Sequence, residues 1–255
     1  MFDLSGTRAA IFGLANEDSI AWHVARALKQ AGASIHVGYQ QRFKSRVLQA
    51  LKDADFAPDG LHRCDVTDPA EVDAFFTAVG GPLHVMVHSI GFAPLETFGK
   101  PISELSSAEF SQALEISAYS LLRLTRAALP HLAGPASVIA MTYLGSTRVV
   151  PGYKVMGVAK AALESIVREL AVEVGPRGVR VNAISAGPIR TLAAQAVSGI
   201  DVMLERYAEV APLRTRVEAS DVADTALFLA SSASRKLTGQ VLFVDAGFSI
   251  LGAVG

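Results

Sequence analysis

The chain of 255 residues has only one cysteine, Cys64. One cysteine excludes an intramolecular disulfide and is typical of the reducing cytoplasm, where we expect this protein to act. An excess of either charge is also missing, because 23 basic residues balance 24 acidic ones for a formal net charge of −1. The charge therefore points to neither nucleic acid nor an anionic membrane as a partner. We interpret Cys64 as a small buried residue near a strand end rather than a reactive thiol.

Signal-peptide features and uninterrupted apolar runs are missing as well. The N-terminal Met-Phe-Asp-Leu-Ser-Gly-Thr-Arg lacks the charged-then-apolar order of a signal peptide. Two stretches, 74–95 and 127–147, have no Asp, Glu, Lys or Arg, but glycine, proline and histidine interrupt both, so we predict no membrane span. No linker, repeat or low-complexity segment divides the chain. With 51% hydrophobic residues, we expect one domain, residues 1–255, with a large core.

What the sequence does contain is a regular alternation of short apolar runs and helical patterns. Runs such as Val-Met-Val and Val-Leu-Phe-Val are apolar on both faces, as strands between two helix layers are. The predicted strands are 8–13, 34–39, 60–65, 83–89, 137–142, 179–185 and 240–245. The predicted longer helices are 19–31, 68–79, 106–132, 153–175 and 218–230. This order predicts an α/β fold, a single Rossmann-like doubly wound parallel sheet of about seven strands with helices on both faces.

In such a sheet, ligands bind beyond the carboxyl ends of the strands. The first strand ends at Gly13 and a helix starts near Ser19, which is where a dinucleotide pyrophosphate would lie. The G-x-G-x-x-G pattern is absent, so an ordinary strand-to-helix turn is equally consistent, although the Ser19 hydroxyl could bond a phosphate. After the second strand, Gln40 suits the free ribose hydroxyl of NADH, whereas basic residues at 42, 44 and 46 keep NADPH as the alternative. Asp65, after the third strand, could accept from an adenine amino group or begin a turn.

Tyr153 and Lys160 lie seven residues apart in the predicted helix 153–175, which places them two turns apart and close to one helix face. A phenol in that position can donate a proton or hydrogen bond, and a nearby ammonium makes the donation easier. On this spacing alone, a surface tyrosine and a solvated lysine remain the better explanation.

A metal site is the other chemistry that a local pattern suggests. His84 and His88 are four residues apart, a spacing that would suit two metal ligands on a helix. On the predicted strand they are about 13 Å apart, too far to share an ion. We therefore predict no metal site.

Five motifs are more specific than any single residue. They are Gly-Leu-Ala-Asn-Glu-Asp-Ser-Ile-Ala-Trp (13–22), His-Ser-Ile-Gly-Phe-Ala-Pro (88–94), Thr-Tyr-Leu-Gly-Ser (142–146), Tyr-Lys-Val-Met-Gly-Val-Ala-Lys (153–160) and Gly-Val-Arg-Val-Asn-Ala-Ile-Ser-Ala-Gly-Pro-Ile-Arg-Thr-Leu-Ala (178–193). Together they resemble the NADH-dependent enoyl-acyl-carrier-protein reductases of bacterial type II fatty-acid synthesis, a divergent branch of the short-chain dehydrogenase/reductases. This family has a serine in the first loop where its relatives keep glycine, so the missing glycines support the resemblance.

The resemblance implies an oxidoreductase that transfers a hydride from NADH to the β-carbon of trans-2-enoyl thioesters on acyl carrier protein, the last reduction step of fatty-acid elongation. It places Tyr153 at the thioester oxygen, where an enolate forms, Lys160 on the nicotinamide ribose, and Tyr143 as a second active-site tyrosine. The implied cofactor-binding residues are Gly13, Ser19, Ile20, Gln40, Asp65, Val66, Ser89, Ile90, Gly91, Lys160, Ile189, Arg190, Thr191, Leu192 and Ala193. The implied substrate-binding residues are Ala93, Tyr143, Tyr153 and Met156. A segment at about 190–210 is implied to be a substrate lid.

Two other functions stay open. A short-chain dehydrogenase acting on a ketone or alcohol would carry its tyrosine four residues before the lysine, where this chain has Met156, which has no proton to give. A non-catalytic NAD(P)-binding regulator would be expected to have lost Tyr153 or Lys160, and both are present. Segment 115–120 also lacks the asparagine of the usual proton relay, a loss that enolate chemistry tolerates because an enolate can take its proton from solvent.

An assembly of several subunits is the last expectation. The predicted helices 106–132 and 153–175 carry many small apolar residues, and the tail 247–255 is apolar too. Such surfaces suit burial against another subunit. The sequence indicates an oligomer, and the resemblance implies a homotetramer.

Overall fold

The centre of the molecule is a parallel sheet. The computed structural model describes residues 2–52, 54–196 and 200–252. Within them the sheet has seven strands in the order β3-β2-β1-β4-β5-β6-β7, all paired in parallel. They are β1 (Arg8–Phe12), β2 (Ser34–Tyr39), β3 (Gly60–Arg63), β4 (Leu83–His88), β5 (Leu132–Thr142), β6 (Val179–Ala186) and β7 (Val241–Val244). The predicted fold class and strand number are confirmed.

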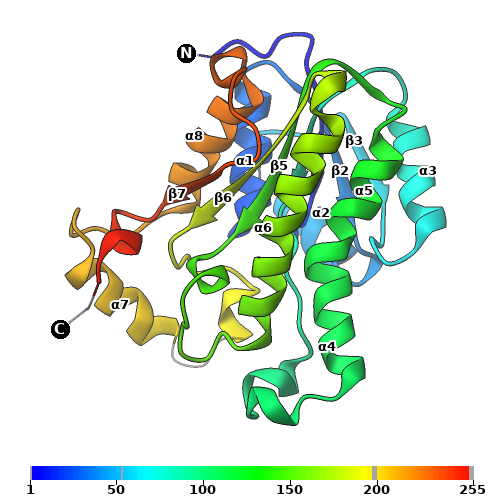
Figure 1. The fold of residues 1–255 in the computed structure, drawn as a ribbon. Coiled ribbons are helices and arrows are strands. Elements are labelled where there is room, and N and C mark those ends of the chain that lie inside the picture. Colours follow the sequence, from blue (N-terminus) through cyan, green and yellow to red (C-terminus); the bar gives the residue numbers. More distant parts are fainter. Residues whose placement is uncertain (1, 53, 197–199, 253–255) are drawn as a thin grey trace.

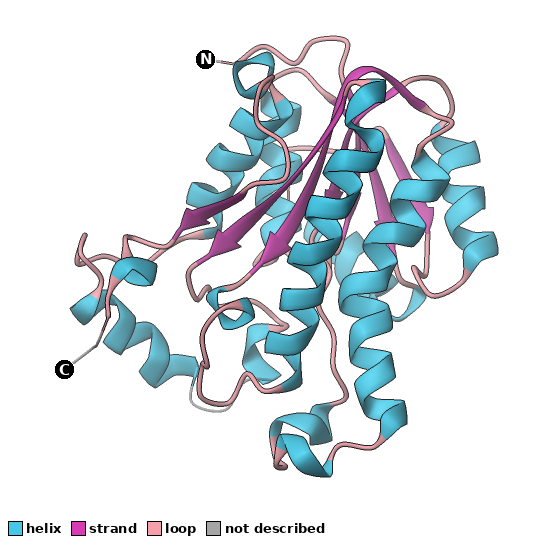
Figure 2. Ribbon diagram, in the orientation of Figure 1, coloured by secondary structure: helices cyan, strands magenta, loops and turns pink. Residues whose placement is uncertain are grey.

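Two helix layers cover the sheet, as Figures 1 and 2 show. One layer holds α1 (Ile20–Gln30), α2 (Lys44–Lys52) and α8 (Ala219–Ala230), and the other holds α3 (Pro69–Val79), α5 (Ser120–Ala128) and α6 (Val155–Val174). Two further helices, α4 (Ser107–Leu114) and α7 (Ile200–Val210), lie beyond the end to which the strand arrows point. The carboxyl ends of the strands therefore point towards the region of α4 and α7.

The central strands are apolar on both faces because each face meets its own helix layer. Along β4, Val85 and Val87 belong to the core under α1 and α8, whereas Met86 belongs to the core under α3, α5 and α6. Along β5, Ile139 and Val138 divide in the same way. Successive side chains of a strand point to opposite faces, so a continuous apolar run is what this position requires.

Local capping residues set several helix starts. Asp68 accepts hydrogen bonds from the backbone N–H groups of Ala70 at 2.9 Å and Glu71 at 3.4 Å, and Pro69 occupies the first helical position of α3. This is the start predicted for helix 68–79, because an N-cap aspartate followed by proline satisfies the exposed N–H groups. Cys64 is buried as predicted, and burial raises the pKa of its thiol to about 12.

The single predicted helix 106–132 is wrong in two respects. It is interrupted by a π turn, Glu115–Tyr119, between α4 and α5, and it ends at Ala128. Residue 132 already belongs to β5, which is longer than the predicted strand 137–142. A π turn widens the helix by one residue without any special residue type, so the helical period of the sequence did not reveal it.

The predicted helix 153–175 is wrong at its start. The helix α6 begins at Val155, and Lys154 before it has φ of +45°. Tyr153 therefore lies in the preceding turn, and the argument that Tyr153 and Lys160 share a helix face does not hold. Tertiary contacts, described below, bring the two side chains to the same cavity instead.

Two helices were not predicted. The helix α2 has few apolar residues, with Val47 and Ala50 buried, so its period is weak. The helix α7 falls inside the expected lid 190–210, of which residues 197–199 lie outside the described part. Residues 253–255 of the apolar tail also lie outside it.

Candidate active site

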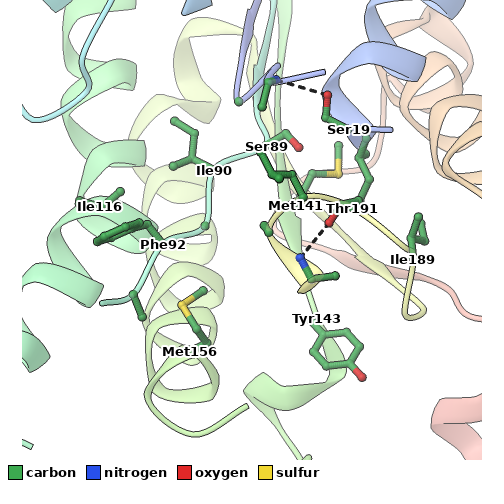
Figure 3. A pocket seen from close by; sticks show the side chains of 18 of the residues that line it. Ser19, Ser89, Ile90, Phe92, Ile116, Met141, Tyr143, Met156, Ile189 and Thr191 are labelled. Atoms are coloured by element: carbon green, nitrogen blue, oxygen red, sulfur yellow. Dashed lines mark hydrogen bonds between the residues drawn. The ribbon is translucent and has the colours of Figure 1, made fainter. Parts of the chain in front are cut away.

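A cavity of about 640 Å³ opens at the carboxyl edge of the sheet. It lies where the strand order reverses between β1 and β4, the point at which open parallel sheets bind ligands. Its volume is in the range of small-molecule and cofactor sites. All the site residues expected from the sequence line it except Arg190. Figure 3 shows Ser19, Tyr143, Ile189 and Thr191 on one side of the view, with Ile90, Phe92, Ile116 and Met156 on the other.

The loop after β1 comes very close to the end of β4. Gly13 has φ of +99°, and a Cβ there would overlap the carbonyl oxygen of Ser89. The hydroxyl of Ser19 donates to the Asn16 carbonyl and accepts from the N–H of Ala15 at 3.4 Å. Ser19 thus closes its own loop directly before α1, where exposed N–H groups and the helix dipole favour a phosphate.

Gln40 and Asp65 form the far end of the cavity. The Gln40 amide nitrogen donates to Asp65 at 2.7 Å, and the hydroxyl of Thr67 donates to the other Asp65 oxygen at 2.7 Å. Burial acts to raise the pKa of the Asp65 carboxyl, but these hydrogen bonds outweigh it, and the pKa lies below its usual value. Asp65 is therefore an ionised acceptor held in place. Arg42 also lines this end, with its guanidinium 5.2 Å from the ring centroid of Phe92.

The two tyrosines lie against each other, although they are ten residues apart in the sequence. Their ring centroids are 4.9 Å apart at an interplanar angle of 71°. Burial raises the pKa of Tyr143 to about 12, and burial together with Tyr143 also raises the pKa of Tyr153. Both phenols are therefore neutral and able to donate near neutral pH. Gly145 makes room for the pair, since a Cβ there would lie 2.5 Å from a ring carbon of Tyr153.

Lys160 is buried in the wall of the cavity. Its ammonium donates to the carbonyl of Met141 at 2.8 Å and to that of Ile90 at 3.1 Å. Among the described residues these are its two hydrogen-bond partners, so one N–H remains for a ligand. Burial lowers the pKa of Lys160 to about 8, although the carboxylate of Glu164 acts to raise it. Glu164 is itself buried and accepts from the Thr142 hydroxyl at 2.6 Å.

The loop after β6 supplies one wall of the cavity. Ile189, Thr191, Leu192 and Ala193 line it. The Thr191 hydroxyl accepts from the N–H of Ala194 at 3.1 Å, which turns the loop at that point (Figure 3). Arg190 is the expected site residue that the structure does not bring in: its guanidinium lies 2.5 Å from Asp201 of α7, with both side chains mostly exposed.

Sequence reasoning missed several residues of the cavity. Phe92 and Ile116 form its apolar side, and Met203 of α7 reaches it with its sulfur 3.8 Å from the Tyr143 hydroxyl. Phe92 stood within a recognised motif, so its loop position could have indicated a role. Ile116 and Met203 carried no signal, because the π turn and α7 reach the cavity only through tertiary packing.

His84 and His88, the two histidines considered as metal ligands, each contact a different part of the protein. His84 accepts from the backbone N–H of Arg8 at 3.1 Å, and His88 lies 2.7 Å from the Ser120 hydroxyl. The described residues include no group of three or more His, Cys, Asp or Glu side chains that could hold a metal ion. Each described helix is too short or too polar to cross a bilayer.

A protein-family model described as enoyl-(acyl carrier protein) reductase matches residues 13–249. The enoyl-acyl-carrier-protein reductase (NADH) FabI of Synechocystis is 46% identical over 257 residues, spanning 99% of this chain and 100% of that protein. The enzyme of the same name from Escherichia coli is 40% identical over 252 residues, spanning 97% of this chain and 95% of that protein.

Two solved structures of enoyl-acyl-carrier-protein reductases also superpose closely on this chain. The Bacillus cereus enoyl-acyl carrier protein reductase, solved with NADP+ and indole naphthyridinone, superposes with a TM-score of 0.95 at 39% identity, covering 99% of this chain and 100% of that one. The NADH enoyl-acyl-carrier-protein reductase of Aquifex aeolicus gives a TM-score of 0.92 at 40% identity, covering 98% and 99%.

Proposed function

The chain belongs to the enoyl-acyl-carrier-protein reductase family, and we propose that it reduces trans-2-enoyl thioesters on acyl carrier protein with NADH as the hydride donor. It is an oxidoreductase of fatty-acid biosynthesis, and the step is the last reduction of each elongation round. The observation that carries the proposal is the convergence of Tyr143, Tyr153 and Lys160 on one cavity at the switch point of the sheet. Met156 stands where a carbonyl reductase would have its tyrosine.

The cavity fits an extended dinucleotide. Gly13 lets the loop after β1 pack directly against Ser89, which leaves the start of α1 at the cavity for a pyrophosphate, and the ionised Asp65 and the amide of Gln40 suit an adenosine at one end. Lys160 keeps one N–H for the ribose at the other end. We retain the cofactor residues expected from the sequence; of these, Arg190 does not line the cavity, and its guanidinium pairs with Asp201. When bound, the nicotinamide supplies the hydride that the protein itself lacks.

Tyr153 is the proposed donor to the thioester oxygen. Hydride addition at the β-carbon moves negative charge onto that oxygen, and a preorganised donor stabilises the charge by about 2.7–4 kcal/mol. The raised pKa of Tyr153 keeps its proton on the phenol, so it acts as a hydrogen-bond donor rather than as a base. Tyr143 packs against it and fixes its ring. Ala93 and Met156, which line the same cavity, are the proposed contacts of the acyl chain.

Lys160 supports this donor through its charge. Below its pKa of about 8 the side chain is an ammonium, and the carbonyls of Met141 and Ile90 hold it at the cavity wall. A fixed positive charge there binds the ribose and stabilises negative charge near the phenol. Most of the cavity lining is apolar, which lowers the local dielectric and strengthens both interactions.

NADPH is the alternative cofactor. Arg42 and Arg46 line the cavity beside Gln40, and an arginine in this place can accommodate a 2′-phosphate. Arg42 already lies over the rings of Phe43 and Phe92, and Gln40 bonds Asp65. That arrangement supports NADH as the preferred cofactor.

Three further features belong to the proposal. The described parts of segment 190–210 cover the substrate, supported by Leu192, Ile200 and Met203 in the cavity lining. The protein is a single-domain homotetramer, supported by an exposed stripe on α6 that includes Val158, Ala161 and Val172. It acts in the cytoplasm, in line with its single cysteine.

Cofactor oxidation with crotonyl thioester tests the proposal. We expect turnover with NADH, a lower kcat/KM with NADPH, and no turnover of simple ketones. Oxidation with ketones but not with the enoyl thioester would indicate a carbonyl reductase. Tight NADH binding without turnover of either class would indicate a regulator. Each of these two outcomes would contradict the proposed function.

A further inference from the structure

The π turn between α4 and α5 has an unusual content of buried hydroxyl groups. Ser117 inside the turn and Ser120 directly after it are both fully buried. A π turn breaks the regular hydrogen bonding of a helix and is often found at functional sites. The proposed chemistry assigns neither serine, so their partners are informative.

Ser117 binds the backbone of a single residue on another element. Its hydroxyl accepts from the N–H of Phe92 at 2.9 Å and donates to the carbonyl of Phe92 at 2.8 Å. Phe92 lies in the loop of residues 89–94 after β4, which we call the Phe92 loop. One hydroxyl thus satisfies both polar groups of the partly buried backbone of Phe92, a role that a neighbouring strand would play in a sheet. The same oxygen lies 3.8 Å from the sulfur of Met156.

The π turn is itself tied to the sheet. Ser120 donates to the carbonyl of Ile116 at 2.6 Å and lies 2.7 Å from Nε2 of His88, the last residue of β4. Because the hydroxyl hydrogen points to Ile116, Nε2 of His88 carries the proton and donates. His88 is fully buried, and burial together with Lys160 lowers its pKa to about 3, so it is neutral near pH 7. Ser117 is therefore a fixed point for the loop.

The Phe92 loop carries both sides of the site. Ile90 accepts from Lys160 and lines the proposed cofactor region, whereas Phe92 lies near Ile116 and Met156 in Figure 3 and Ala93 also lines the cavity. Arg42, which lines the Gln40 end of the cavity, lies over the ring of Phe92, whereas the described backbone hydrogen bonds of Phe92 run to Ser117. A shift of the loop at Phe92 would therefore move the substrate side while the Lys160–Ile90 contact can persist.

We propose that Ser117 is a positioning residue of the reductase, whose hydroxyl fixes the Phe92 loop and so shapes the acyl-binding side of the cavity. This inference rests on the proposed function. Ser117 acts through Phe92 and Ala93, and its hydroxyl takes no part in proton transfer. The two hydrogen bonds between Ser117 and Phe92 are therefore expected to affect substrate binding and not cofactor binding.

The test compares Ser117→Ala with Ser137→Ala. Ser137 is also buried, and its hydroxyl donates to Leu229 at 2.8 Å, away from the cavity lining. We expect Ser117→Ala to raise KM for crotonyl thioester about tenfold, equivalent to about 1.4 kcal/mol, with the NADH Kd unchanged. Amide hydrogen exchange of the free protein should speed up in the peptide containing Phe92. Ser137→Ala should show neither change.

A second variant guards against simple misfolding. Ser117→Cys keeps a weaker donor and acceptor of similar size, and we expect its KM to fall between those of the wild type and Ser117→Ala. A KM in Ser117→Ala equal to that of Ser137→Ala, or unchanged exchange at Phe92, would overturn the proposal. If the wild-type protein turned over no enoyl thioester, the proposed function would be contradicted. Hydrogen exchange does not depend on catalysis, so it would still decide whether Ser117 holds the Phe92 loop.

Discussion

Burial shifts the pKa values of the two tyrosines and of the lysine of this site in opposite directions. It raises the pKa of Tyr143 and Tyr153, which keeps both phenols protonated, and it lowers the pKa of Lys160, which brings the ammonium close to losing its proton. The charged form is the disfavoured one in each case, because a buried charge loses its hydration. Two neutral donors and one marginally stable cation therefore share the cavity.

Replacing Tyr153 with phenylalanine should lower kcat by about 10²–10³-fold, the usual loss for one oxyanion donor. The NADH Kd should stay the same, because only the enolate donor is removed. Steady-state kinetics and a fluorescence titration measure the two quantities. Tyr143→Phe is the matched control, with a smaller loss expected; the reverse ranking would transfer the donor role to Tyr143.

Activity should fall as pH rises through about 8, where Lys160 loses its charge in the free enzyme. The profile of kcat/KM reports this ionisation. Glu164→Gln should move the fall to lower pH, since the carboxylate acts to raise the pKa of Lys160, and glutamine keeps an acceptor for Thr142. A profile that is flat to high pH, or one that Glu164→Gln leaves in place, would contradict the assignment.

Stability gives an independent check of the same group. The folded pKa of Lys160, about 8, lies below its ordinary value of 10.5, so the unfolded chain binds the proton more tightly. The cost of burying the charge is therefore present below pH 8 and is relieved as pH rises from about 8 to 10.5. Urea unfolding of the wild type should show a gain in this window that is absent from Lys160→Met.

At the scale of elements, the site depends on how closely the turn after β5 approaches α6. A Cβ at Gly157, in the first turn of α6, would lie 2.7 Å from the carbonyl oxygen of Gly145. Gly145 in turn leaves space for Tyr153, and Lys154 takes φ of +45° to enter the helix. The Lys154 side chain donates to the carbonyl of Lys100 at 2.5 Å, which helps to hold this entry. These contacts, rather than helix periodicity, place Tyr153.

Gly157→Ala should therefore destabilise the protein, although alanine is the better helix former. We expect the free energy of unfolding to fall by about 1–3 kcal/mol, as for other insertions into a packed site, and kcat to fall with it. Gly99→Ala is the control, because Gly99 has a φ of −87° and a Cβ there would lie at an ordinary 3.7 Å from the carbonyl oxygen of Glu96; it should be neutral or stabilising by about 0.4–1 kcal/mol. Denaturant unfolding compares the two. Equal effects would show that the close approach to Gly145 does not matter.

In the described part of the molecule, the sheet separates two large apolar cores, and a small third cluster contains Ala93, Val155 and Met156. The core under α1 and α8 includes Ile11 and Val37, and the core under α3, α5 and α6 includes Phe12 and Phe75. Helix α6 buries one side in the second core, yet its opposite side keeps Val158, Ala161 and Val172 exposed in the single chain. Val158 and Ala161 are three residues apart, and Val172 returns to the same side about four turns after Val158, with Ser165, Arg168 and Glu169 exposed between them. This is the surface that supports the proposed homotetramer.

Ala161→Arg should break the proposed tetramer into smaller species, because a long charged side chain would stand in the middle of the stripe. Light scattering after size-exclusion chromatography measures the mass. Leu48→Arg on α2 is the control, since it adds the same charge at an exposed apolar position 46% accessible to solvent on a different helix. A wild-type monomer, or an unchanged tetramer in Ala161→Arg, would rule out α6 as the interface.

The sequence by itself determined the presence of the seven strands, several of the helices, and which strand ends carry chemistry. Apolar runs, the Asp68–Pro69 cap and the glycine after β1 depend on neighbours in the chain, so their outcome could be predicted locally. Strand ends then indicated the cavity, and the residues assigned to it line it, apart from Arg190. The ion pair of Arg190 with Asp201 could not be foreseen, because Asp201 belongs to a helix that was not predicted.

Only the tertiary structure decided how those ends meet. It placed β1 beside β4, set Tyr143 against Tyr153 and introduced the π turn that holds Phe92. It also lowered the pKa of Lys160, which requires burial by residues from several elements. These features depend on contacts between groups far apart in the chain, and neither local periodicity nor residue spacing contains them. Spacing alone even gave the wrong reason for pairing Tyr153 with Lys160, because the turn before α6 is shaped by packing against Gly145.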